Sequence, residues 1–115
     1  MIPKLSIITI CYNDLNGLKV TIPSVLSQNY RDYEWIIIDG ASSDGSREYI
    51  DDTVNYINAN VDFGQMRVVW KSEPDTGIYN AMNKGVRLSH GEYTLMLNSG
   101  DYLVDEYVIE KVIPL

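Results

Sequence analysis

Two runs of β-branched, almost continuously apolar residues constrain the fold of this chain most strongly. They occupy residues 5–11 and 33–39, and each ends abruptly in polar residues. A strand that is apolar at successive positions is buried on both faces, which is typical of a parallel sheet covered by helices on both sides. The two runs therefore predict an α/β fold, a mostly parallel sheet with helices on both faces.

Segments with the apolar spacing of helices alternate with strand-like runs along the rest of the chain. The expected strands are residues 5–11, 33–39, 66–71 and 93–97, and the expected helices are residues 18–28, 47–58, 78–88 and 105–113. This order of strand and helix, repeated four times, again indicates a parallel sheet with crossover helices.

Three expected helices carry signals at their ends. Pro23 is tolerated only near the first turn of a helix, so the first helix is expected to begin close to Thr21. Either Ser43 or Asp44 is expected to cap the second helix, because both residue types accept hydrogen bonds from free N–H groups. Gly91 is expected to be the C-terminal cap of the third helix.

The composition fits one small globular domain of 115 residues and argues against a nucleic-acid partner. Its 16 acidic and 9 basic residues give a net charge of −7, without the basic footprint that nonspecific nucleic-acid binding needs. A phosphate ligand stays compatible, because backbone N–H groups and a metal can hold it.

The single cysteine and the lengths of the apolar runs indicate in which cellular compartment the protein is expected. Cys11 lies inside an apolar run, so we expect a buried core residue and a reducing, cytoplasmic location. The longest apolar runs fall far short of the ~20 residues of a membrane span. Peripheral association with the inner face of the membrane, through a part outside this segment, stays open.

Each expected strand is followed by polar residues that would meet at one edge of a parallel sheet. Tyr12 and Asn13 follow the first strand, Asp39 ends the second, Asp75 follows the third, and residues 98–101 follow the fourth. Ligands of open α/β sheets bind at this carboxyl edge. The convergence predicts a nucleotide site in which Tyr12 walls a ring and Asp39 accepts a hydrogen bond from a base or ribose.

Residues 98–101, Asn-Ser-Gly-Asp, place one carboxylate, that of Asp101, among small residues. This leaves room for a hydrated divalent cation and the phosphates that it bridges. Lys84, or the helix N-terminus near Ile78, would add positive potential. Each assignment has a plainer alternative: a turn for residues 98–101 and for Asp39, a packed aromatic for Tyr12, and a solvated side chain for Lys84.

Several other kinds of site are disfavoured by missing motifs. The chain has no Gly-x-Gly-x-x-Gly after its first strand, no P-loop and no Gly-x-Ser-x-Gly nucleophile elbow. Its one histidine and one cysteine make no zinc cluster. A nucleotide site of a different kind is the remaining expectation.

Four segments taken together resemble the family 2 glycosyltransferases, which have the GT-A fold. They are residues 6–13, 24–46, 77–85 and 91–101, in the family's order over nearly the whole chain. The resemblance implies a nucleoside-diphosphate sugar, usually a UDP-sugar, as donor and a Mg²⁺ or Mn²⁺ ion. It also implies inverting transfer to a polysaccharide or lipid-linked acceptor, most like the branch that builds bacterial surface polysaccharides.

The same resemblance implies roles for individual residues. Tyr12, Asn13 and Asp39 would face the nucleoside, Asp75 and Lys84 would lie near the base or phosphate, and Asn98, Ser99 and Asp101 would lie by the metal and diphosphate, with Asp101 as the metal ligand. The catalytic base and the acceptor-binding half are expected beyond Leu115. Residues 1–115 would then be a truncated, Rossmann-like nucleotide-sugar-binding half that is inactive alone.

Two departures from the family pattern keep other functions open. Gly40 stands where many members have a second acid after the second strand, and Gly100 stands where the second acid of the Asp-x-Asp motif aligns. A non-catalytic nucleotide-binding or scaffold domain of the same fold is one alternative. A sugar-phosphate nucleotidyltransferase is another, although the loop after the first strand lacks the basic, glycine-rich sequence that it predicts.

Overall fold

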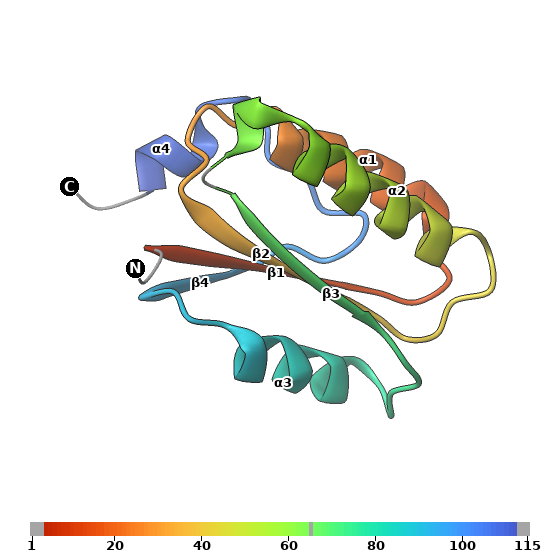
Figure 1. The fold of residues 1–115 in the computed structure, drawn as a ribbon. Helices are drawn as coiled ribbons and strands as arrows, with labels where there is room; N and C mark the ends of the chain where they lie inside the picture. The colour runs from red at the N-terminus through yellow and green to blue at the C-terminus, as the bar shows by residue number, and fades with distance from the viewer. Residues whose placement is uncertain (1–3, 65, 113–115) are drawn as a thin grey trace.

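The computed structural model describes residues 4–64 and 66–112, and it has four parallel strands with helices on both faces of the sheet (Figure 1). The elements are β1 Leu5–Cys11, α1 Leu15–Leu26, β2 Tyr33–Asp39, α2 Ser46–Ala59, the short 3₁₀ helix η1 Val61–Phe63, β3 Arg67–Ser72, α3 Ile78–Leu88, β4 Tyr93–Met96 and α4 Val108–Val112. The predicted α/β architecture is confirmed.

The strand order is β3-β2-β1-β4, and every neighbouring pair is parallel. The chain moves outward from β1 to β2 and β3, then crosses back over the sheet through α3 to β4 on the other side of β1. The strand order therefore reverses between β1 and β4. Such a topological switch point opens a crevice in which open α/β sheets bind ligands.

Side chains of β1 and β2 alternate between two apolar layers. Ile7 and Trp35 belong to the layer under α1 and α2, whereas Ile8 and Ile36 belong to the layer over α3 (Figure 1). All seven residues of each strand are buried, as expected for strands covered on both faces. Cys11 is buried in the first layer, which confirms its predicted place in the core, and burial raises the pKa of its thiol.

The first helix begins earlier than expected. α1 starts at Leu15, where the side chain of Asp14 accepts a hydrogen bond from the Gly17 N–H, and Pro23 lies inside the helix. The prediction of a start near Thr21 is wrong because packing of the buried face of α1 outweighs the hydrogen bond lost at one proline.

None of the helices in the described residues is long and apolar enough to cross a membrane.

The other predicted helix ends differ in detail. α2 has Gly45 as its N-cap, in the left-handed region at φ 100°, while Asp44 accepts a hydrogen bond from the Ser46 N–H. α3 ends at Leu88, and its C-cap is Ser89, which has extended backbone, so Gly91 does not cap the helix. A Cβ on Gly91 would lie 2.6 Å from the backbone nitrogen of Ser6. Gly91 is therefore needed for the close approach of this segment to β1.

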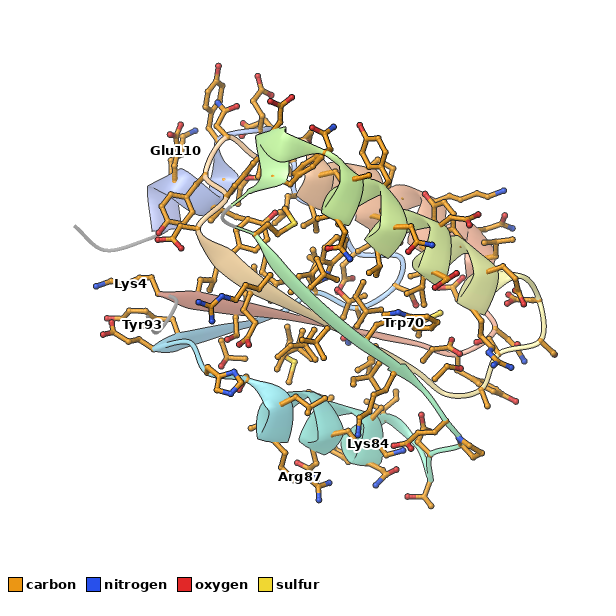
Figure 2. All side chains as sticks on the ribbon, viewed as in Figure 1. Lys4, Trp70, Lys84, Arg87, Tyr93 and Glu110 are labelled. Carbon is orange, nitrogen blue, oxygen red and sulfur yellow. The ribbon has the colours of Figure 1, made fainter. Side chains whose placement is uncertain are left out.

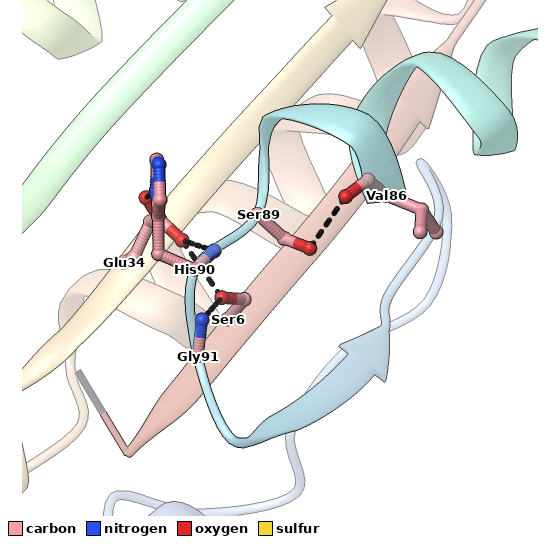
Figure 3. Close-up of polar contacts among 6 residues, drawn as sticks. All are labelled: Ser6, Glu34, Val86, Ser89, His90 and Gly91. Atoms are coloured by element: carbon pink, nitrogen blue, oxygen red, sulfur yellow. Dashed lines mark hydrogen bonds and ion pairs between the residues drawn. The ribbon is translucent and has the colours of Figure 1, made fainter. Parts of the chain in front are cut away.

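A buried carboxylate fastens the connection between α3 and β4 to the amino end of the sheet (Figure 3). Glu34 Oε2 accepts hydrogen bonds from the His90 N–H at 2.7 Å and from Ser6 Oγ at 2.8 Å, and Glu34 Oε1 lies 2.7 Å from His90 Nδ1. The Gly91 N–H donates to Ser6 Oγ at 2.8 Å. Burial opposes ionisation of Glu34, but the hydrogen bonds from His90 and Ser6 outweigh it and lower its pKa.

We expect Glu34→Gln to lower the free energy of unfolding by about 2 kcal/mol at pH 7, because the charge-assisted hydrogen bonds are lost. A lowered pKa gives stability that is present above the ordinary glutamate pKa, about 4.3, and is lost as the pH falls through the folded-state value. Urea unfolding should therefore show the difference shrinking below about pH 4. A difference that is independent of pH would contradict the assignment.

The matched control is Glu92→Gln. Glu92 forms an ion pair with Lys4 at 3.4 Å, and its side chain is exposed. Exposed ion pairs contribute about 0–1 kcal/mol. The free energy of unfolding of this variant should therefore stay close to that of the wild type at pH 7 and below about pH 4.

Candidate functional site

The carboxyl edge of the sheet brings together the loops that follow all four strands. These loops are residues 12–14 after β1, 40–45 after β2, 73–77 after β3 and 97–101 after β4. The loops after β1 and β4 flank the switch point, and the loops after β2 and β3 lie beside them in the sheet order. The predicted convergence of polar loops on one edge is therefore confirmed.

Asp39 is the centre of a hydrogen-bond network that joins the loops after β2 and β3. Its carboxylate is fully buried and accepts from the Ser42 N–H at 2.9 Å, from Ser42 Oγ at 2.5 Å and from Ser72 Oγ at 2.8 Å. These contacts match the turn-forming alternative for Asp39. Its predicted contact with a nucleoside stays a prediction.

Asn13 links the loops after β1 and β2. The Asn13 N–H donates to Ser42 Oγ at 2.8 Å, and Asn13 Oδ1 accepts from the Ser43 N–H at 2.8 Å. Asn13 has φ 47°, a left-handed conformation that asparagine tolerates better than most residues. Asp44 adds a second link by accepting from the Leu15 N–H at 3.0 Å. The two loops are thus held in one fixed arrangement before any ligand binds.

Tyr12 and Asp75 meet over the backbone of Gly40. A Cβ on Gly40 would lie 2.7 Å from Asp75 Oδ2 and 3.2 Å from Tyr12 Cδ1. The Tyr12 side chain is 66% exposed, so it is not the packed aromatic of the plainer alternative. The structure therefore places two predicted nucleotide-binding residues, from the loops after β1 and β3, side by side at the edge of the sheet.

The turn after β4 is held by hydrogen bonds to a side chain of helix α1. Thr21 Oγ1 donates to the Asp101 carbonyl at 2.6 Å and accepts from the Gly100 N–H at 2.9 Å. Gly100 has φ 95°, a conformation that costs about 1–2 kcal/mol for a residue with a Cβ. This backbone conformation explains glycine at position 100, where the family pattern has an acid. Ser99 continues the ladder, with its N–H bonded to the Ile10 carbonyl.

Two side chains of this turn, those of Asn98 and Asp101, carry oxygen atoms of the type that hard divalent cations bind. Asn98 Oδ1 is buried and has no hydrogen-bond partner among the described residues. Asp101 supplies a carboxylate in the same turn, with Oδ2 accepting from the Asn98 N–H at 3.0 Å. Residues 4–64 and 66–112 contain no group of three or more His, Cys, Asp or Glu side chains arranged for a metal. Mg²⁺ bound to a nucleotide needs only one or two carboxylates, because phosphate and water fill the remaining positions.

Lys84 is engaged by the loop after β3. It lies on α3 (Figure 2), and its Nζ donates to the Pro74 carbonyl at 2.9 Å and lies 3.2 Å from Glu73 Oε1. Its side chain is only 18% exposed, so it is not the freely solvated lysine of the plainer alternative. These contacts fix the loop that carries Asp75. The predicted contact of Lys84 with base or phosphate stays a prediction.

Sequence reasoning missed the residues that position the site. Thr21, Ser42 and Ser72 hold the loops in place, but each is a small polar residue of a type that is common in helices, turns and strands. The partner of Thr21 lies 80 positions away and that of Ser72 lies 33 positions away. No local pattern reports such pairings.

The sequence from residue 6 to residue 115 matches the family model described as glycosyl transferase family 2. The chain belongs to glycosyl transferase family 2. The match contains all four strands and all four loops of the carboxyl edge except for the first residue of β1. The family resemblance inferred from the four motifs is therefore confirmed.

Curated relatives of this family 2 chain are themselves glycosyltransferases. An uncharacterised glycosyltransferase of Mycobacterium tuberculosis is 38% identical over 96% of this chain and 39% of its own length. The PGL/p-HBAD biosynthesis glycosyltransferase of Mycobacterium bovis is 31% identical over 96% of this chain and 40% of its length. The poly-beta-1,6-N-acetyl-D-glucosamine synthase of Staphylococcus epidermidis is 33% identical over 92% of this chain and 24% of its length.

Solved structures show that the chain has the GT-A fold. The mannosyltransferase PcManGT of Pyrobaculum calidifontis, in complex with GDP-Man and Mn²⁺, superposes with a TM-score of 0.80 at 19% identity, over 95% of this chain and 31% of that one. TarS of S. aureus, in complex with UDP-GlcNAc, superposes with a TM-score of 0.76 at 19% identity, over 94% of this chain and 29% of that one. The chain spans less than half the length of these proteins.

Proposed function

We propose that this chain binds the donor of a glycosyltransferase that moves a sugar from a nucleoside-diphosphate sugar to a polysaccharide or lipid-linked acceptor. The observation that carries the proposal is the switch point, where the Asp101 carboxylate shares one turn with Asn98 Oδ1, an oxygen that has no hydrogen-bond partner in the described part of the chain. Tyr12 and Asp75 lie at the same sheet edge. The names of the relatives and the nucleotide sugars bound to PcManGT and TarS support this choice of donor class.

In the proposed reaction the acceptor hydroxyl loses its proton to a base, and its oxygen forms a bond to the anomeric carbon. The bond from that carbon to the diphosphate breaks on the opposite face, which inverts the configuration. Asn98 and Asp101 would hold a Mg²⁺ or Mn²⁺ ion, which stabilises negative charge on the departing diphosphate. The proposal takes the base and the acceptor site from residues outside those that the structure describes.

The chain's own contribution is to hold the donor in a fixed place. Thr21 positions the backbone of residues 98–101, and the network from Asp39 through Ser42 to Asn13 positions the loops after β1 and β2. A preorganised site loses little free energy to ordering when the donor binds. The cytoplasmic location and any association with a membrane stay predictions.

We expect isothermal titration of the full chain to show binding of UDP or GDP in the presence of Mn²⁺ and weaker binding in its absence. Asp101→Ala should remove most of the Mn²⁺-dependent gain, which we expect to be about tenfold or more, because the ion then loses its carboxylate ligand. Absence of binding of any nucleoside diphosphate at millimolar concentration would overturn the proposal.

The control separates this proposal from the non-catalytic alternative. Asp105→Ala removes a carboxylate that accepts from the Tyr107 N–H and lies outside the turn of residues 98–101. It should leave the Mn²⁺ dependence unchanged. A scaffold domain without a metal site predicts that Asp101→Ala also leaves it unchanged.

A further inference from the structure

The chain between β4 and α4 forms no helix or strand of its own, although it carries the turn of Asn98 and Asp101. This stretch is residues 97–107, all of which the structure describes (Figure 1). Its side chains do little to fix it, because Tyr102 and Val104 are exposed and Leu103 is only partly buried. Contacts from another part of the chain must therefore keep the stretch from moving.

Helix α1 binds the backbone of this stretch through two hydroxyl groups on one face. Thr21 Oγ1 accepts from the Gly100 N–H and donates to the Asp101 carbonyl, so it holds both ends of this dipeptide. Ser24 Oγ accepts from the Leu103 N–H at 3.1 Å. Residues three positions apart lie on the same face of a helix, so one face of α1 offers hydroxyl groups to successive backbone groups of the stretch.

Gln28 continues this row just beyond the end of α1 and is completely buried. Its Nε2 donates to the Asp105 carbonyl at 2.6 Å, and its Oε1 accepts from the Ile109 N–H at 3.0 Å, near the start of α4. Nε2 also donates to the Ser24 carbonyl at 3.1 Å. The amide thus has both its N–H groups and its oxygen paired with backbone groups. We call Thr21, Ser24 and Gln28 the polar row of α1.

The polar row departs from the apolar face expected of a helix that packs on a sheet. Other core-facing residues of α1 are apolar: Leu18, Ile22 and Val25. Thr21 and Gln28 are just as completely buried, and burying a hydroxyl or an amide costs free energy unless it is hydrogen-bonded. Both find partners in the backbone of residues 100–109, most of which lies outside any helix or strand. Hydrogen-bond geometry, rather than burial of side chains, therefore sets the position of this stretch.

We propose that the polar row of α1 positions the cation ligands: it fixes the backbone of residues 98–109, so that the Asp101 carboxylate and Asn98 Oδ1 are in place before the ion binds. This inference rests on the proposed function and adds three positioning residues, which contact the backbone of the stretch. Thr21 should act most strongly, because it holds the dipeptide that contains Asp101. Ser24 and Gln28 should act more weakly, because they hold the chain at points further from the turn.

The ratio of the nucleotide dissociation constants without and with Mn²⁺ tests the inference in the full chain. Isothermal titration with UDP and with GDP gives this ratio for each variant. Thr21→Val keeps the shape of the side chain and removes its hydrogen bonds to the turn, so the ratio should fall about tenfold. Thr21→Ser keeps the hydroxyl and should restore most of the ratio.

Thr53→Val is the matched control. Thr53 is buried on α2, and its Oγ1 donates to the Tyr49 carbonyl at 2.8 Å. The same substitution therefore removes a hydrogen bond of a buried helical threonine away from the carboxyl edge of the sheet. It should leave the ratio as in the wild type. A Thr21→Val ratio equal to that of the wild type overturns the inference.

Stability and ion dependence should separate along the row. Gln28→Met removes three hydrogen bonds at a buried position, so it should lower the urea midpoint of unfolding more than Thr21→Val does and yet lower the ratio less. Ser24→Ala, the milder change, should also lower the ratio less than Thr21→Val and takes the place of Gln28→Met if that variant does not fold. A ratio that falls in step with stability instead overturns the positioning role.

Amide hydrogen exchange of the ligand-free chain gives a readout that needs no nucleotide. The Gly100 N–H should be protected in the wild type and in Thr53→Val, and should lose its protection in Thr21→Val, where its acceptor is gone. Unaltered protection in Thr21→Val overturns the inference alone. A wild type whose affinity for UDP and GDP is the same without and with Mn²⁺ overturns the proposed function and the role of the row toward the ion.

Discussion

Replacing Asp39 with alanine is expected to lower the free energy of unfolding by about 3–5 kcal/mol. The carboxylate is fully buried and accepts three hydrogen bonds, from the Ser42 N–H, Ser42 Oγ and Ser72 Oγ. Alanine leaves the Ser42 N–H without an acceptor in the interior, at a cost of about 1–3 kcal/mol, and forfeits two further hydrogen bonds of about 1 kcal/mol each. Urea unfolding followed by circular dichroism measures the loss.

Asp39→Asn separates the structural role of Asp39 from its predicted contact with the nucleoside. The asparagine oxygen can accept from the Ser42 N–H and Ser72 Oγ, and its NH₂ group can donate to Ser42 Oγ after the hydroxyl rotates. We therefore expect a loss of only about 1 kcal/mol. If this stable variant binds nucleotide as the wild type does, Asp39 acts through the loops alone. A loss of affinity without a loss of stability would support direct contact.

Gly91→Ala is expected to cost about 3 kcal/mol of stability, because the methyl group meets backbone that has nowhere to move. The Cβ would lie 2.6 Å from the Ser6 nitrogen and 2.8 Å from the Leu5 carbonyl carbon. Both atoms belong to β1, which is hydrogen-bonded to neighbours on both sides. Thermal and urea unfolding of the variant measure the effect.

Gly91→Asn distinguishes close approach from helix capping. A left-handed helix cap accepts asparagine better than alanine, so a capping glycine predicts that Gly91→Asn is the milder variant. Close approach to β1 predicts that asparagine, which is larger, destabilises at least as much as alanine. A milder asparagine variant would contradict the role that the structure gives Gly91.

The sheet and the edge at which its polar loops meet could be predicted because their signals are local. The continuous apolar runs at residues 5–11 and 33–39 require burial on both faces, and the alternation with helices then requires parallel strands. Both runs are strands with the expected bounds, β1 Leu5–Cys11 and β2 Tyr33–Asp39. Since the ends of parallel strands share one edge, the meeting of the polar loops followed from chain order alone.

The helix ends were harder to predict because packing decides them. Pro23 is a strong local signal against a helix that continues through it, yet α1 runs from Leu15 to Leu26. Leu18, Ile22 and Val25 are all buried in the layer under α1, and burial of each such side chain contributes about 1.5–3 kcal/mol. Their sum exceeds the cost of about 3 kcal/mol for one proline within a helix.

By itself, the sequence determined the fold class, the family and the edge of the sheet at which the polar loops meet. Only the tertiary structure decided which contacts the predicted residues make. Asp39 accepts hydrogen bonds in a buried network, and Lys84 binds the loop after β3. Asp75 lies against Gly40. The physical reason is that residue type and periodicity report burial and secondary structure. Which acceptor keeps an unpaired oxygen depends on donors that come from distant parts of the chain.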